Sequence, residues 1–195
     1  MKNYKKNLEL LTKNFVYSKE MEHDACGVGL IASTEGKKSR AIVEHGIEAL
    51  KAVWHRGAVD ADGKTGDGAG IHVEIPKDFF IEKIQVTGHD YDSSEICVGM
   101  IFLPRNDYSA QENCKTIVES ELTKNNFSIY GWRQVPVNPK VLGEKALQTM
   151  PEIIQVLFKS NDPNLLDKNL ERKIYETRKR IENKAFDASL NNFYI

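Results

Sequence analysis

The longest uninterrupted run of apolar residues and glycine, Ile96 to Leu103, is the feature that most constrains how this chain can fold. Pro104 ends the run, and because proline cannot donate a hydrogen bond to a neighbouring strand, the pattern predicts a buried core strand. The run is far shorter than the ~20 apolar residues that a membrane-spanning helix needs. With 195 residues, of which 41% are hydrophobic, the chain is predicted to form one soluble domain without a membrane segment.

Strand and helix patterns alternate along the rest of the chain. Apolar runs and period-two alternation predict further strands at 28–33, 71–75, 128–137 and 152–159, and a strand that is cut short at 192–195. Helical spacing of apolar residues predicts helices at 40–54, 77–84, 108–124 and 163–185. The loops between these elements are long, and this favours a layered α+β fold over a doubly wound sheet.

Composition excludes several kinds of partner. The 27 basic and 28 acidic residues leave a net charge of −1, which argues against a dedicated nucleic-acid surface and against a polybasic membrane anchor. Three cysteines without paired spacing, and the lack of an apolar stretch of signal-peptide length, predict reduced thiols and a cytoplasmic location. The five histidines show no metal-ligand spacing, so no metal site is predicted.

Cys26 is the candidate catalytic residue. It is followed by Gly27 and opens a short apolar run. A free α-amino group titrates near 7.7–8, so an amine on the same residue as a thiol can accept the thiol proton. That amine is free only if residues 1–25, a polar leader, are removed. Cys97 and Cys114 lie on apolar patterns and are interpreted as structural cysteines, the commoner role of a buried thiol.

Three blocks of sequence carry a family resemblance: Glu22–Gly29, which contains the Cys-Gly pair, Trp54–Gly63, which contains Arg56-Gly57, and Lys64–Ile71, which contains Gly-Asp-Gly-Ala-Gly. The first two blocks together resemble class II glutamine amidotransferases. The third resembles the glutamate synthase branch of that class. The likeness is dense over these blocks and thinner, but compatible, as far as residue 195.

The resemblance implies a site and a reaction. Cleavage before Cys26 would leave 26–195 as the N-terminal portion of the amidotransferase domain, and the Cys26 thiolate would attack the side-chain amide of glutamine. A γ-glutamyl thioester would form, ammonia would leave, and water would release glutamate. Arg56 and Gly57 match the family's arginine-glycine pair: a guanidinium near the thiol favours the thiolate, and a glycine permits close backbone approach to the substrate.

The same resemblance implies a fold and partners. The expected fold is a four-layer αββα sandwich of the N-terminal-nucleophile type, of which this chain would hold a part. Ammonia would pass to the remaining domains of the synthase, which make glutamate from 2-oxoglutarate with FMN and an iron–sulfur cluster. No cofactor is expected within these residues, and electrons would come from a donor subunit or a ferredoxin.

Two other functions stay open at this level. The chain could be an N-terminal-nucleophile amidohydrolase that acts on another amide. It could also be a non-catalytic module that keeps the sandwich and serves in interaction or regulation, although Cys26, Arg56 and Gly57 are all in place. A flexible solvent loop is the alternative to tight backbone packing for the Gly- and Asp-rich segment 57–70.

Two elements of the family pattern are missing, and this leads to a first prediction. The chain contains no Asn-Gly pair for an oxyanion hole, and its Ser39-Arg40 pair is followed by Ala41 instead of the family's Phe-Ser-Thr. Because one lost oxyanion donor costs ~100–1000-fold in turnover, we expect negligible ammonia release from glutamine by these 195 residues, even after removal of the leader. Robust release in a coupled ammonia assay would contradict this expectation.

Overall fold

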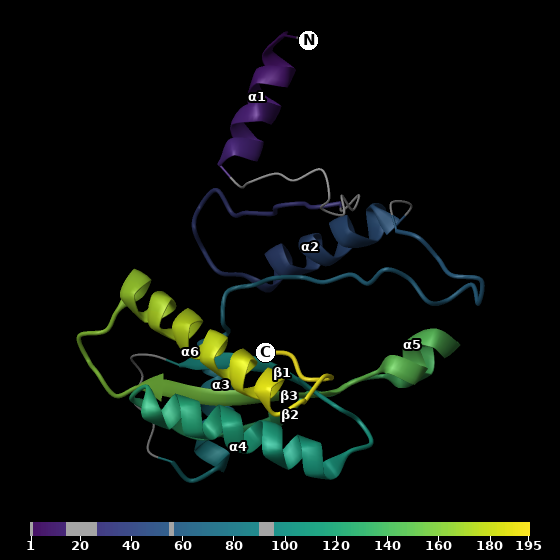
Figure 1. The fold of residues 1–195 in the computed structure, drawn as a ribbon. Coiled ribbons are helices and arrows are strands. Elements are labelled where there is room, and N and C mark those ends of the chain that lie inside the picture. Colours follow the sequence, from purple (N-terminus) through teal and green to yellow (C-terminus); the bar gives the residue numbers. More distant parts are fainter. Residues whose placement is uncertain (1, 15–26, 55–56, 90–95) are drawn as a thin grey trace. The chain divides into compact units, whose positions relative to one another are not determined.

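A computed structural model describes residues 2–14, 27–54, 57–89 and 96–195 (Figure 1). The chain divides into two compact units. The first takes in residues 1–58 and 66–71, and the second takes in 59–65 and 72–195. In the described residues, no helix combines the length and the apolar character needed to cross a membrane.

The first unit contains two helices. α1 spans Lys2–Lys13 and lies within the predicted leader; its Leu10 is 58% exposed. α2 spans Arg40–Ala52 and confirms the helix predicted at 40–54. One face of α2 is half-buried. Ile71 packs close to Gly46 on this helix, and a Cβ added at Gly46 would lie 3.1 Å from the Cδ1 atom of Ile71.

The second unit is built on a three-stranded antiparallel sheet with the order β1-β3-β2. β1 spans Cys97–Leu103, β2 spans Phe127–Gln134 and β3 spans Glu152–Ser160, so the strands predicted at 96–103, 128–137 and 152–159 are confirmed. β3 therefore pairs along both of its edges. A register shift between Ile129 and Gly131 leaves one extra residue, Tyr130, in β2.

Two long helices cover one face of this sheet. α4 spans Tyr108–Lys124, and α6 spans Asp167–Asp187. Their apolar residues form the main core with alternate residues of the strands, among them Ile101, Val118, Val156 and Ile181. α6 also buries Thr177, which the apolar pattern did not predict; its hydroxyl donates to the Lys173 carbonyl oxygen at 2.8 Å.

α3 covers part of the other sheet face. It spans Lys77–Val86 and confirms the short helix predicted at 77–84. Its Phe80 and Ile84 form a second cluster with Tyr130 and Leu157. The extra residue in β2 is thus the one that joins this second cluster. The connection between β2 and β3 carries two short helices, η2 at Pro139–Val141 and α5 at Glu144–Thr149, neither of which was predicted.

Two predicted strands are wrong. Residues 28–33 and 71–75 are extended, but neither segment is assigned to a strand. Val28 is 93% exposed and Leu30 is 90% exposed, and Ile71, Val73 and Ile75 are exposed as well. Apolar alternation favours a strand only where another strand supplies the partner hydrogen bonds, and in the described part of the chain neither segment has such a partner. At the C-terminus, the predicted strand 192–195 is reduced to a single bridge between Phe102 and Tyr194.

The fold class is confirmed as α+β, with helices packed on an antiparallel sheet whose strand order is β1-β3-β2. The described residues form one sheet with α4 and α6 on one face. The second sheet of the expected four-layer sandwich stays a prediction of the family resemblance.

A buried carboxylate joins the two covering helices. Glu121 of α4 has a side chain only 5% exposed, and its Oε1 atom lies 2.5 Å from Lys184 Nζ of α6 and 3.5 Å from Lys124 Nζ. The hydrogen bond from the Lys184 ammonium holds the pKa of the Glu121 carboxyl below its usual value of 4.5. A buried charge is tolerated when it is paired in this way.

We expect Lys184→Met to destabilise the second unit by about 2 kcal/mol at pH 7, because Glu121 would lose its nearest cation while Lys124 remains. Since the pKa of Glu121 is lowered on folding, its stabilising contribution is present above pH 4.5 and is lost as pH falls through the folded pKa. The difference between variant and parent should therefore shrink in acid, as measured by urea unfolding. Lys179→Met, which removes a cation from an exposed pair with Glu182, is the matched control and should change stability by less than ~0.5 kcal/mol.

Candidate active site

The predicted nucleophile and its cationic neighbour, Cys26 and Arg56, lie outside the described residues. Their catalytic roles therefore stay predictions. Gly57, the third predicted site residue, is described. The structure also describes the segments that flank these positions: residues 27–33 after Cys26, α2 before Arg56, and the loop from Gly57 onward.

Backbone hydrogen bonds hold the residues that flank positions 55 and 56. After α2 ends at Ala52, the Val53 N–H donates to the Ala49 carbonyl oxygen at 3.3 Å. The Gly57 N–H then donates to the Trp54 carbonyl oxygen at 3.0 Å. A Cβ at Gly57 would lie 3.4 Å from that same oxygen, in van der Waals contact with the backbone.

The loop after Gly57 folds back on itself within the first unit. The Ala58 N–H donates to Asp67 Oδ2 at 3.0 Å. A Cβ at Gly66 would lie 3.4 Å from the Ala58 carbonyl oxygen, so the two backbone segments approach closely. Asp67 and Gly66 belong to the Gly-Asp-Gly-Ala-Gly block, and this packing favours a structured loop over a flexible one.

In the second unit, residues 60–65 form a tight turn around the carboxylate of Asp62. The Asp60 N–H donates to the Thr65 carbonyl oxygen at 2.8 Å, and Gly63 adopts a φ of +67°, which favours glycine. Asp62 Oδ1 accepts the N–H groups of Lys64 and Thr65 at 2.9 and 2.7 Å, and Oδ2 accepts the Thr65 hydroxyl at 2.5 Å. The Thr65 hydroxyl is the main reason that the pKa of Asp62 lies well below its usual range.

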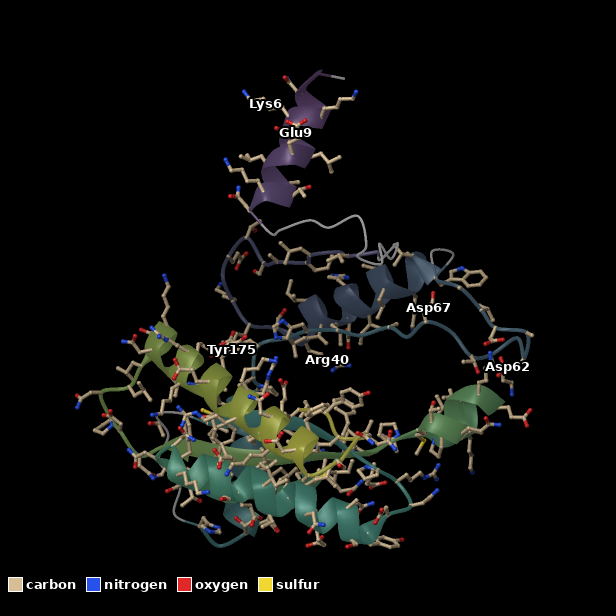
Figure 2. The ribbon with its side chains drawn as sticks, viewed as in Figure 1. Lys6, Glu9, Arg40, Asp62, Asp67 and Tyr175 are labelled. Atoms are coloured by element: carbon tan, nitrogen blue, oxygen red, sulfur yellow. The ribbon has the colours of Figure 1, made fainter. Side chains whose placement is uncertain are left out.

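The short helix α5 anchors this turn, as Figure 2 shows for Asp62. The backbone N–H of Lys145 also donates to the Asp62 carboxylate, and Lys145 Nζ lies 2.5 Å from Asp60 Oδ2. A Cβ at Gly143 would come within 2.6 Å of the Thr65 nitrogen, so only glycine fits there without displacing the turn. Gly143 and Lys145 are structural supports of this turn that sequence reasoning missed, because nothing in their local sequence signals a contact some eighty positions away.

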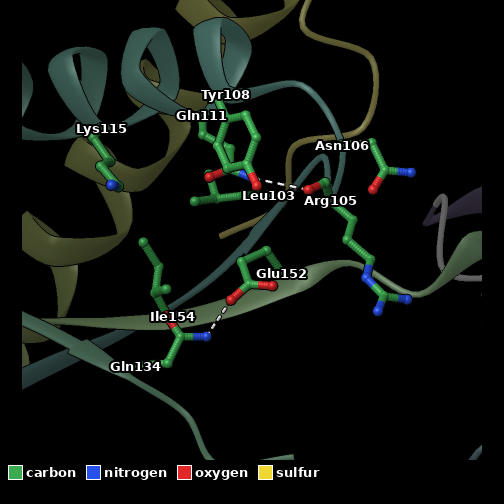
Figure 3. A pocket seen from close by; sticks show the side chains of 9 residues that line it. All are labelled: Leu103, Arg105, Asn106, Tyr108, Gln111, Lys115, Gln134, Glu152 and Ile154. Atoms are coloured by element: carbon green, nitrogen blue, oxygen red, sulfur yellow. Dashed lines mark hydrogen bonds between the residues drawn. The ribbon is translucent and has the colours of Figure 1, made fainter. Parts of the chain in front are cut away.

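A polar pocket of about 300 Å³ lies elsewhere in the second unit, where β1 leads into α4 (Figure 3). Gln111 Nε2 donates there to the carbonyl oxygens of Pro104 and Arg105 at 2.8 and 3.2 Å, and Gln134 bonds Glu152 across the strands. The two Gln111 bonds satisfy backbone carbonyl groups at the strand-to-helix connection. The pocket contains none of the predicted site residues.

The described residues give no support for a resident metal. They contain no group of three or more His, Cys, Asp or Glu side chains that could hold an ion. Cys97 and Cys114 are buried in the main core, and burial raises the pKa of the Cys114 thiol to about 11.

Comparison with known proteins identifies the class. The family described as class-II glutamine amidotransferases matches residues 26–195, and the chain belongs to this family. The chain is 51% identical over 192 residues to the glutamate synthase [NADPH] large chain of Azospirillum brasilense, covering 98% of this chain and 13% of that protein. It is 40% identical over 162 residues to a ferredoxin-dependent glutamate synthase of Arabidopsis thaliana, covering 83% of this chain and 10% of that protein.

The chain thus spans about a tenth of the length of these relatives. The family membership confirms the resemblance drawn from the three sequence blocks. The family match also begins at Cys26, the residue that sequence analysis placed at the start of the mature domain.

We expect Thr65→Val to raise the pKa of Asp62, because the strongest donor to its carboxylate is lost while the N–H donors of Lys64 and Thr65 remain. Carbon-detected NMR titration of the carboxyl group measures this shift. A lowered carboxyl pKa stabilises the turn above pH 3.8 and loses that effect as pH falls, so any loss of stability in the variant should be visible at neutral pH and fade in acid. Thr149→Val removes a hydroxyl bonded to Lys145 within α5 and should leave the Asp62 titration unchanged.

Proposed function

We propose that this chain supplies the glutaminase activity of a glutamate synthase, releasing ammonia from glutamine for the synthesis of glutamate from 2-oxoglutarate. The observation that carries the proposal is the family match that starts at Cys26 and extends to Ile195. The identity of 51% to a glutamate synthase large chain selects that branch of the class.

Cys26 acts as an N-terminal nucleophile once residues 1–25 are removed. Its α-amino group takes the thiol proton, and the sulfur attacks the carbonyl carbon of the glutamine side chain. As the carbon–nitrogen bond breaks, the proton passes to the leaving nitrogen and ammonia departs. Water then attacks the thioester, which yields glutamate and restores the thiol.

Arg56 and Gly57 assist this chemistry in different ways. The Arg56 guanidinium favours the thiolate form of Cys26 through its positive charge. The N–H of Gly57 is bonded to the Trp54 carbonyl oxygen, so the contribution of Gly57 is space for the substrate instead of a donated hydrogen bond. The next residue, Ala58, is held by a bond from its N–H to Asp67 Oδ2.

The rest of the reaction belongs to other parts of the enzyme. FMN and an iron–sulfur cluster bind in the other synthase domains, and a nicotinamide-linked subunit or a ferredoxin supplies electrons. The names of the relatives include NADPH, NADH and ferredoxin as donors. The enzyme works in the cytoplasm, where its thiols stay reduced.

The test uses a protein of the relatives' length that carries this sequence. We expect its intact mass to show the loss of residues 1–25, and a glutamine-analogue electrophile to label Cys26 in a manner that glutamine blocks. Cys26→Ala should abolish the labelling. Cys114 is an internal control because its raised pKa keeps the thiol protonated, so it should remain unlabelled in a peptide map.

Each other outcome selects a different function. Absence of labelling at Cys26 in the processed protein would favour the non-catalytic module. Labelling that glutamine fails to block would favour an amidohydrolase with another substrate. Full glutamine turnover by an unprocessed protein would overturn the role of the α-amino group.

A further inference from the structure

The polar pocket where β1 leads into α4 takes no part in the chemistry proposed for Cys26 (Figure 3). Its volume of about 300 Å³ is at the lower end of the ~300–1,000 Å³ range of ligand pockets, so it suits a small molecule. Two of its lining residues, Leu103 and Ile154, are apolar and belong to the main core. The others carry polar or charged side chains and come from the β1–α4 connection, α4, β2 and β3.

Strand pairing and one buried amide fix the backbone around this pocket. Leu103 of β1 pairs with Glu152 of β3, at the end of the sheet. Gln111 of α4 is 9% exposed, and its Nε2 atom donates to the carbonyl oxygens of Pro104 and Arg105 at 2.8 and 3.2 Å. The backbone that carries the lining side chains is therefore already in place, and this lowers the cost of binding a ligand.

The lining offers one cation and one anion to a ligand. Lys115 is already neutralised, because its Nζ atom lies 2.8 Å from Glu112 Oε1. In the part of the chain that the structure describes, neither Arg105 nor Glu152 forms an ion pair, so the two are not paired with each other. Glu152 accepts a hydrogen bond at Oε1 from the neutral amide of Gln134, and Oε2 remains as an acceptor.

We propose that this pocket binds a free α-amino acid with a short, neutral, polar side chain. The fork of the Arg105 guanidinium matches a carboxylate, and Glu152 accepts hydrogen bonds from an ammonium group. A ligand with two carboxylates is disfavoured because Glu152 would repel the second, and a simple amine would leave Arg105 without a partner. The amides of Asn106 and Gln134 supply hydrogen bonds to a neutral side chain.

The test uses the chain with Cys26→Ala, which removes the candidate nucleophile, and L-asparagine as the probe. Two analogues isolate the two charges: succinamate lacks the α-ammonium group, and 3-aminopropanamide lacks the α-carboxylate. Binding is followed by the NMR shifts of the Arg105 and Gln111 amides as each ligand is added. The Val118 amide, in the main core, reports whether each variant stays folded.

We expect saturable shifts with L-asparagine, and an affinity at least about tenfold lower for each analogue, because a charge-assisted hydrogen bond is lost in each case. Arg105→Gln and Glu152→Gln should each weaken the binding of L-asparagine by a similar factor. Lys168→Gln, at an exposed position of α6 outside the pocket, is the matched control and should leave the affinity unchanged.

Two results would overturn the proposal. Equal binding of succinamate and L-asparagine would make the pocket an anion site instead of an amino-acid site. Absence of saturable shifts in the folded chain is the result expected if Arg105 and Glu152 pair with each other in solution. Because Cys26 is replaced throughout, neither result bears on the labelling experiment, and the two proposals can fail separately.

Discussion

The pairing of β3 along both of its edges is the constraint on which the second unit depends. Because its backbone groups are satisfied on both sides, β3 can be buried on both faces. Val156 and Phe158 face α4 and α6, and Leu157 faces α3. The connection from β2 to β3 is held at both ends by this pairing, and it carries α5. The position of the turn around Asp62 therefore follows, through Lys145 and Gly143, from the central strand.

Two carboxylates connect distant parts of the second unit, in different physical settings. Glu121 is buried, so its pairing with Lys184 offsets a large desolvation cost and bears on stability. Asp62 is exposed to solvent, and its hydrogen bonds from Thr65 and Lys64 define the shape of a turn. The first contact determines how the helices pack. The second determines the local shape of residues 60–65.

Sequence and structure contribute differently to the candidate site. The residue types and spacing around Cys26, Arg56 and Gly57 were sufficient to identify the class, and the family match confirmed it. The structure adds how the flanking backbone is held, through the Gly57–Trp54 bond and the contact of Ala58 with Asp67. The contacts of Gly143 and Lys145 with the turn at 60–65 had no sequence signal. Residues so far apart in the sequence meet only because the strands between them pair into a sheet.

The sequence by itself determined the elements whose stability is local. The helix at 108–124 was predicted to the residue from its apolar spacing, and the structure adds an Asp107 cap that accepts the Ala110 N–H within the same segment. The strand within 96–103 was also predicted, from a continuous apolar run, and so was the strand within 152–159, whose apolar run is interrupted only by Gln155. Residues 28–33 and 71–75 also carry apolar patterns typical of strands. Only the tertiary structure decided that these two segments do not join a sheet. A helix closes its hydrogen bonds within its own sequence, whereas a strand forms only where the fold places a partner beside it.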